Sequence, residues 1–228
     1  MENQILLGDC YLLLKETPSK SVDLILTDPP YQISRESNFS NHSNTKFNKI
    51  SLDFGDWDKE EINIGLLFQE FYRVLKKGGT VIFFYDIWKS NDVLLNATKV
   101  GFSQPRVCQW VKTNPVPINS KRNYLSNAIE YFFTFVKGGK PTFKSYYDRG
   151  IYNFPICHGK ERTSHPTQKP LSLINELVTK HSNEGDVILD CFAGSGTVGQ
   201  SCKDLKRDFI LMEKDEGYYN IIKTRLSQ

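Results

Sequence analysis

The chain has 228 residues, of which 39% are hydrophobic and 13% aromatic, and its net charge is +3 at neutral pH. This composition predicts one folded domain spanning residues 1–228 and excludes a chain that is disordered throughout. No apolar run approaches the roughly 18 residues that cross a bilayer, and the first residues lack the basic segment of a signal peptide. The five cysteines are scattered without a Cys-x-x-Cys pair, so we expect neither a disulfide framework nor a metal site. A reducing, cytoplasmic setting is favoured.

The charge is unevenly distributed along the chain. Residues 106–169 hold eleven basic and three acidic side chains, a balance of +8, whereas the rest of the chain carries −5. A basic region in an otherwise acidic protein is typical of a phosphate-binding surface, although a solvated loop region would look the same.

Apolar runs and helical repeats alternate along the chain. Strands are predicted at 22–27, 80–85, 107–111, 129–136, 187–190 and 209–213. Helices are predicted at 64–75, from 170 onward, at about 195–205 and near the end up to 226, the first of them stopping at Gly78-Gly79. This alternation predicts an α/β fold with a mostly parallel, twisted sheet and helices on both faces.

Two segments fall outside this alternation. The Ser- and Asn-rich stretch at 34–48 predicts a mobile loop at 32–50. Residues from about 137 to 164 are polar and basic with interspersed aromatics, and we expect them to form an insert that is not part of the sheet. The three tryptophans, Trp57, Trp88 and Trp110, are expected in the core or in a pocket wall.

A glycine-rich turn follows the predicted strand at 187–190. The strand ends in Asp190, and Gly194, Gly196 and Gly199 complete a Gly-x-Gly-x-x-Gly pattern that opens a helix. The next strand ends at Glu213, where an acid can accept both ribose hydroxyls of a nucleoside. The cluster predicts an adenosine-containing cofactor, and by itself leaves NAD and S-adenosylmethionine open.

The segment Asp28-Pro29-Pro30-Tyr31 follows the strand at 22–27, so it lies at the carboxyl edge of the sheet. The prolines fix the backbone and remove two N–H donors, which leaves carbonyl oxygens unpaired. A carboxylate, a free carbonyl and an aromatic ring suit a planar base that carries an exocyclic amine.

Together, Asp-Pro-Pro-Tyr and Phe-x-Gly-x-Gly resemble the DNA amino-methyltransferases that use S-adenosylmethionine. The base-pocket motif precedes the cofactor motif, which resembles the circularly permuted β group and implies its Rossmann-like fold. Gly8-Asp9-Cys10 and the segment from His165 to Pro170 are similar to further family motifs, whereas Cys191 stands where the family often has proline.

The resemblance assigns roles residue by residue. It implies a catalytic set formed by Asp28, Pro29, Pro30 and Tyr31. It implies cofactor contacts at Asp9, Cys10, Asp28, His165, Thr167, Lys169, Asp190, Phe192, Gly194, Ser195, Gly196, Thr197 and Glu213. We expect DNA contacts in the basic region at Lys112, Asn114, Lys121, Arg122, Tyr124, Lys140, Lys144 and Arg149, and target recognition in the insert at about 137–164.

Within the family, Asp at the first motif position is usual for adenine-N6 enzymes and Ser for cytosine-N4 enzymes. Asp28 therefore implies methyl transfer to the N6 amine of a flipped-out adenine, with cytosine N4 as the alternative and an NAD-dependent oxidoreductase as a more distant one. No metal is expected. The resemblance implies a bacterial or phage source and leaves open a separate restriction endonuclease, a monomer or a homodimer, and the sequence recognised.

Overall fold

The computed structural model describes residues 3–30, 62–115 and 127–227. The chain divides into two compact units, one formed by 1–29 with 64–228 and the other by 30–63. The fold described below belongs to the first unit. The predicted loop at 32–50 lies outside the described residues, as do Tyr31, Lys121, Arg122 and Tyr124.

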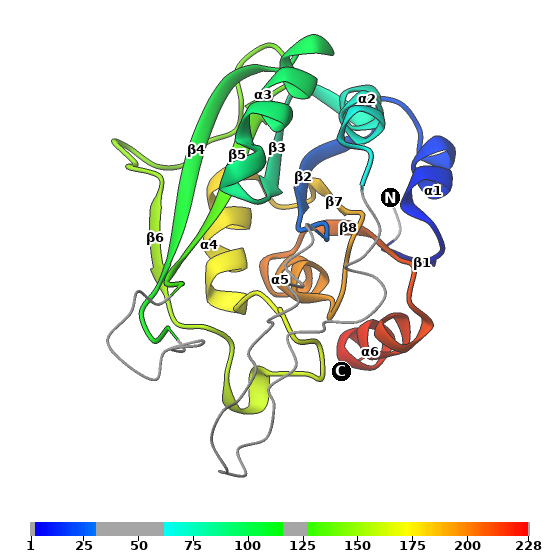
Figure 1. The fold of residues 1–228 in the computed structure, drawn as a ribbon. Coiled ribbons are helices and arrows are strands. Elements are labelled where there is room, and N and C mark those ends of the chain that lie inside the picture. Colours follow the sequence, from blue (N-terminus) through cyan, green and yellow to red (C-terminus); the bar gives the residue numbers. More distant parts are fainter. Residues whose placement is uncertain (1–2, 31–61, 116–126, 228) are drawn as a thin grey trace, which may run out of the picture. The chain divides into compact units, whose positions relative to one another are not determined.

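The core of the first unit is an eight-stranded sheet of the described residues (Figure 1). In sheet order its strands are β1 (Gln4–Leu7), β8 (Asp208–Glu213), β7 (Val187–Asp190), β2 (Val22–Thr27), β3 (Leu75–Phe84), β5 (Ile129–Val136), β4 (Ser103–Lys112) and β6 (Ile151–Phe154). Neighbouring strands are parallel except that β5 runs antiparallel to both β3 and β4. The prediction of a mostly parallel α/β sheet is confirmed.

Helices cover both faces of this sheet. They are α1 (Cys10–Glu16), α2 (Ile64–Val74), α3 (Ser90–Lys99), α4 (Leu171–His181), α5 (Thr197–Leu205) and α6 (Glu216–Leu226), with short 3-10 turns at Ile87–Lys89 and Gly159–Glu161. Successive strand side chains point to opposite faces. Phe83 accordingly meets Phe68 of α2 edge-on at 5.3 Å, whereas Phe84 joins the buried cluster that contains Ile174 of α4 and Val198 of α5.

The junction between α2 and β3 differs from the prediction. The helix ends at Val74 and the strand begins at once with Leu75, so the two glycines lie inside the strand rather than after the helix. Gly78 has φ +84°, and a Cβ on Gly79 would lie 3.0 Å from the carbonyl oxygen of Asp23. The glycines therefore serve an irregular, closely packed start of β3 rather than a helix cap.

The expectation that the insert lies outside the sheet is wrong for residues 151–154. These form β6, which pairs in parallel with β4 at the edge of the sheet, and the buried Tyr152 ring lies 5.4 Å from Phe132. The expectation for Trp88 is also wrong, because its side chain is 84% exposed on the turn after β3. Trp110 is buried as expected and donates from Nε1 to the Phe154 carbonyl at 3.0 Å, while Trp57 lies outside the described residues.

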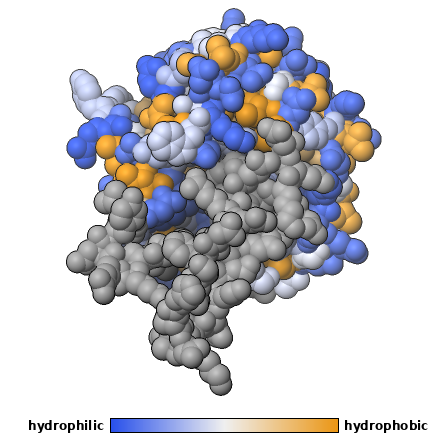
Figure 2. Space-filling view, viewed as in Figure 1, coloured by the Kyte–Doolittle hydropathy of each residue, from blue (hydrophilic) through white to orange (hydrophobic). Residues whose placement is uncertain are grey.

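The surface of the described residues is mainly hydrophilic on the face shown in Figure 2, with hydrophobic side chains scattered among the polar ones. Single exposed apolar side chains are normal on a folded protein. Among the helices of the described residues, none has the length and apolar character that crossing a membrane requires.

Candidate active site

The site lies where the strand order of the sheet reverses. From β2 the chain continues to β3 on one side, while β7, from the far end of the sequence, pairs with the other side of β2. Ligands of open α/β sheets bind at such a switch point, beyond the carboxyl ends of the strands. Asp28 follows β2 and Asp190 ends β7, and the Thr27 hydroxyl donates to Asp190 Oδ1 at 2.8 Å.

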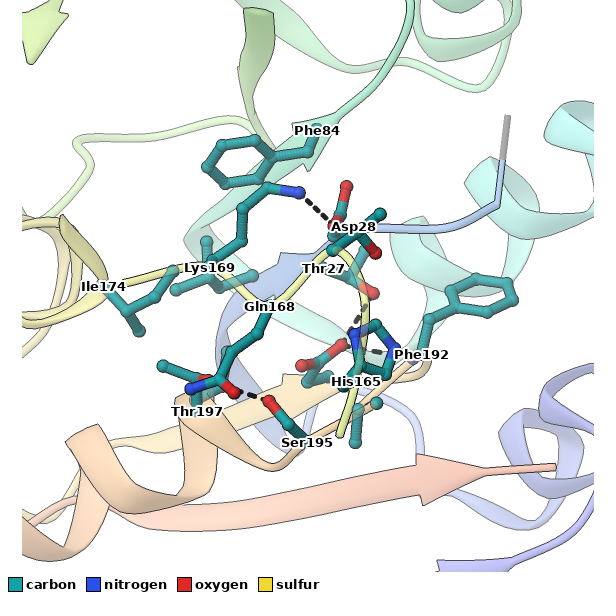
Figure 3. A pocket seen from close by; sticks show the side chains of 16 residues that line it. Thr27, Asp28, Phe84, His165, Gln168, Lys169, Ile174, Phe192, Ser195 and Thr197 are labelled. Carbon is teal, nitrogen blue, oxygen red and sulfur yellow. Dashed lines mark hydrogen bonds and ion pairs between the residues drawn. The ribbon is translucent and has the colours of Figure 1, made fainter. Parts of the chain in front are cut away.

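A small cavity of about 50 Å³ opens at this point (Figure 3). The sheet contributes Leu26, Thr27, Asp28, Phe84 and Asp190 to the lining. The remaining lining residues come from the segment before α4, from α4 itself, and from the glycine turn and α5: His165, Thr167, Gln168, Lys169, Ile174, Phe192, Ala193, Gly194, Ser195, Thr197 and Val198.

Most of the predicted cofactor residues line this cavity. They are Asp28, His165, Thr167, Lys169, Asp190, Phe192, Gly194, Ser195 and Thr197. Four others do not line it: Asp9, Cys10, Gly196 and Glu213. Sequence reasoning missed Thr27 and Phe84, although each lies next to the end of a strand that it did identify.

The four residues outside the cavity have local roles. Asp9 caps α1 by accepting from the Tyr11 amide at 2.8 Å, and Cys10 is buried in the first turn of that helix. Gly196, with φ +75°, precedes the first residue of α5. Glu213 stands at the end of β8 and accepts from the Gly194 amide at 2.7 Å. This bond ties the glycine turn to the next strand.

The glycine turn makes a close approach to the segment before α4. Gly194 has φ +52°, and a Cβ there would lie 2.9 Å from His165 Nε2. The His165 ring also lies 4.5 Å from the Tyr218 ring of α6. Burial, followed by repulsion from Lys169, lowers the pKa of His165 to about 4, so the imidazole is neutral at neutral pH. Glycine is therefore the residue that lets the turn and this neutral ring share one wall of the cavity.

Asp190 is a buried carboxyl group with two hydrogen-bond donors. Besides the Thr27 hydroxyl, the Phe192 amide donates to its Oδ1 at 3.1 Å. Burial raises its pKa to about 7 despite these bonds, with a smaller contribution from the negative charges of Asp28 and Glu213. The group thus exchanges its proton near neutral pH.

A chain of alternating charges begins at the cavity wall with Asp28 and Lys169 and continues behind it to Glu130 and Lys112. The Lys169 amine forms an ion pair with Asp28 Oδ2, lies 3.2 Å from Glu130 Oε2 and lies 5.2 Å from the centre of the Phe84 ring. Figure 3 shows its side chain extending beneath that ring toward Asp28. Lys112 in turn pairs with Glu130 Oε1 at 2.8 Å. Four different strands or segments therefore bring two carboxyl groups and two lysine amines together.

Burial shifts the pKa values of this cluster unequally. It raises the pKa of Asp28, because the attraction of Lys169 only partly offsets the loss of solvent. Burial also acts to raise the pKa of Glu130, but the attraction of Lys169 and Lys112 outweighs it and the pKa lies below its ordinary value. Burial acts to lower the pKa of Lys169, and the two carboxylates overcome this and raise it. Glu130 is therefore the more acidic of the two carboxyl groups.

The residues that were predicted to contact DNA differ in how exposed and how engaged their side chains are. Lys112 is engaged with Glu130 and lies over the Trp110 ring, and the Asn114 side chain accepts from the Ile156 amide at 2.7 Å. Three others are exposed on the segment between β5 and β6, namely Lys140, Lys144 and Arg149.

Comparison with known proteins places this site in a family. The family model described as a DNA methylase, for N6 and N4 methyltransferases, matches residues 22–224. The chain is 31% identical to the type II methyltransferase M.HinfI of Haemophilus influenzae, covering 99% of this chain and 68% of that protein. It is also 31% identical to the type II methyltransferase M2.DpnII of Streptococcus pneumoniae, over 96% of this chain and 87% of that one.

Solved structures agree with these relatives. The crystal structure of M1.HpyAVI with SAM superposes with a TM-score of 0.73 at 27% identity, covering 98% of this chain and 99% of that one. The cytosine-N4-specific PvuII DNA methyltransferase superposes with a TM-score of 0.76 at 18% identity, covering 99% and 86%, which shows a shared fold. The chain that carries Asp28 and the glycine turn at one sheet edge belongs to the N6/N4 DNA methylase family and is a DNA methyltransferase.

Proposed function

We propose that this DNA methyltransferase transfers a methyl group from S-adenosylmethionine to the N6 amine of an adenine flipped out of DNA. The observation that carries the proposal is the Asp28 carboxylate. It lines the cavity next to the glycine turn, and its Oδ1 is buried and accepts no hydrogen bond from the described residues. An open acceptor of this kind suits an amine N–H.

The cofactor side of the cavity fits S-adenosylmethionine by the groups that line it. Gly194 leaves room where a side chain would collide with His165, and the start of α5 presents the hydroxyls of Ser195 and Thr197. The backbone N–H groups of a helix start favour a carboxylate or another anionic group. Asp190 and the Phe192 ring complete a lining with both polar and aromatic faces. We propose that these residues hold the cofactor.

On the base side, this chain's residues bind and orient the amine. Asp28 Oδ1 would accept one N–H of the exocyclic amine, and the Pro29 carbonyl would accept the other. These bonds turn the nitrogen lone pair out of conjugation with the ring and toward the donor, so positioning carries most of the rate acceleration. S-adenosylmethionine supplies a methyl group on a positively charged sulfur, already activated for direct displacement.

We further propose that the chain acts as a single methyltransferase domain in which residues 137–164 contact DNA. Lys140, Lys144 and Arg149 are exposed there, and the side chains of Tyr146 and Tyr147 are almost fully exposed beside them. Cations suit the phosphates and exposed aromatic rings can stack on bases. Reversal of all three cationic charges to Glu should weaken DNA binding and flatten its salt dependence without changing cofactor binding.

The test is methyl transfer from tritiated S-adenosylmethionine to mixed-sequence DNA, followed by digestion to nucleosides. Label in N6-methyl-2′-deoxyadenosine is expected, and Asp28→Ala should abolish it while cofactor affinity stays near the wild-type value. Asp92→Ala, at an exposed position in the first turn of α3, is the matched control and should retain wild-type activity. A lack of incorporation into any DNA by the wild-type protein would contradict the proposal.

Cytosine N4 is the second candidate. It is favoured by the similarity in fold to the cytosine-N4-specific PvuII enzyme. The same nucleoside analysis decides between the two, because label in N4-methyl-2′-deoxycytidine with none in N6-methyl-2′-deoxyadenosine would replace the first candidate with the second.

A further inference from the structure

Glu130 is a member of the charged cluster to which the proposed chemistry gives no role. It lies near the start of β5, across from Trp110 of β4, and its carboxylate reaches Lys112 on one oxygen and Lys169 on the other. Its Oε2 is buried and lies 3.2 Å from the Lys169 amine, yet takes part in no well-directed hydrogen bond of the described residues. Glu130 therefore has spare capacity to accept.

Lys169 bonds to Asp28 Oδ2, while Oδ1 is the oxygen open to the target amine, so the ammonium charge weakens the carboxylate as an acceptor for that amine. The Lys169 side chain is 8% exposed, which leaves it little access to water as an alternative partner. A buried ammonium that moves away from one carboxylate must find another acceptor, because an unpaired buried charge is very unfavourable. Glu130 Oε2 is the acceptor already within reach.

We propose that Glu130 is a positioning residue that holds the Lys169 amine and draws it from Asp28 when the target amine binds there. The inference rests on the proposed function, since it assigns Asp28 to the target amine. In this arrangement Lys112 matters through Glu130, because it competes with Lys169 for the same carboxylate. The charge on Glu130 then sets how much of the negative charge of Asp28 is available to the target amine.

Two substitutions should shift the Lys169 amine in opposite directions, one toward Asp28 and the other away from it. Glu130→Gln keeps the shape but removes the charge, so Lys169 stays on Asp28 Oδ2 and weakens Oδ1 as an acceptor for the target amine. We expect the single-turnover rate of methyl transfer at saturating DNA and cofactor to fall about 10- to 100-fold, as for other losses of alignment. In Lys112→Met, Lys169 is the only cation left beside Glu130, so Glu130 attracts the Lys169 amine more strongly and draws it away from Asp28.

The pH profile separates this role from a structural one. Among the described residues, the charged groups that face Asp28 are Lys169 from the segment before α4, Glu130 from β5, Lys112 from β4 and Asp190 from β7. Glu130 raises the pKa of Asp28 and Lys112 lowers it. Transfer needs the ionised carboxylate, so the acid limb of the rate should move to lower pH in Glu130→Gln and to higher pH in Lys112→Met.

Glu176→Gln is the matched control. Glu176 shares Lys180 with Asp148 in a second lysine–two-carboxylate cluster, none of whose members lines the cavity. This variant should keep the wild-type rate and acid limb. S-adenosylhomocysteine affinity, measured by calorimetry, should stay within about twofold of wild type in Glu130→Gln, a change of less than about 0.5 kcal/mol.

Urea unfolding shows whether each variant is folded, and Lys112→Met carries the test alone should Glu130→Gln not fold. Acid limbs that stay unshifted, or that move in the same direction, overturn the inference, as does a defect in Glu130→Gln that lies wholly in cofactor affinity. Absence of transfer by the wild-type protein overturns the proposed function and the inference with it. Transfer by the wild type with unshifted acid limbs overturns the inference alone.

Discussion

Replacement of Asp190 by Asn should make the folded protein less sensitive to pH. Both donors to Asp190, the Thr27 hydroxyl and the Phe192 amide, bond to the single oxygen Oδ1, which an Asn side chain also provides. The substitution therefore removes the titrating group while its two hydrogen bonds remain available.

The direction of the pKa shift decides whether stability rises or falls with pH. Burial raises the pKa of Asp190 from 3.8 in an exposed chain to about 7 in the folded protein. The folded state therefore binds the proton more tightly, and this contribution to stability is complete below about pH 4 and is lost as the pH rises through about 7. A shift of about three units corresponds to about 4 kcal/mol in total, of which about 3 kcal/mol is lost between about pH 5 and about pH 8.5.

The assay is urea unfolding of wild type and Asp190→Asn, without cofactor, at several pH values across this range. The difference in unfolding free energy should change by about 3 kcal/mol in favour of the variant as the pH rises, while groups that titrate equally in both proteins cancel. The cofactor is left out because Asp190 lines the cavity and would couple cofactor binding to the measurement. Parallel stability profiles for the two proteins would refute the assignment of a raised pKa to this carboxyl group.

Three further substitutions test the packing around the site. Gly194→Ala should cost about 1–2 kcal/mol of stability because φ is positive at this position, and it should also weaken cofactor binding because the new Cβ would meet His165. Gly159→Ala is the control: φ is +63° there but the space around it is open, so this variant should lose stability only. Equal calorimetric affinities in the two glycine variants would contradict the close approach. Arg207→Met should lower stability by about 2–3 kcal/mol in urea, because the buried guanidinium donates to the side chain and carbonyl of Ser182, and exposed Arg149→Met should change it little. Phe68→Ala should cost about 3–5 kcal/mol, because its ring is fully buried among four others, and a loss below about 1 kcal/mol would show that the cluster repacks.

The sheet was predictable where the sequence carries strong local patterns. Mostly apolar runs identify β2 and β7 with the ends that the structure has, and the residues after each run identify the edge where ligands bind. The short β1, whose apolar run covers only residues 5–7, and β6, within a polar stretch, were not predicted. Their places in the sheet come from pairing with β8 and β4, which local periodicity does not encode.

The charged part of the site was less predictable. Lys169 was expected to contact the cofactor, and it does line the cavity, but its ion pair with Asp28 joins residues 141 positions apart. Glu130 is the second residue of β5, and a charged side chain near the end of a strand commonly faces solvent. Its contact with Lys112 depends on the antiparallel register of β4 and β5, in which Trp110 faces Glu130. A single sequence identifies which side chains carry charge, whereas strand register decides which of them meet.

The pairing of β2 with β7 affects how the chain folds during its synthesis. The Thr27–Asp190 bond spans 163 residues, so β2 leaves the ribosome about 10–30 s before the strand that completes it. During that interval one edge of a mostly apolar strand has no neighbour and is open to pairing with other chains. Folding of the catalytic edge must therefore wait for the end of synthesis, and fragments that stop before β7 should aggregate more readily than the full-length chain.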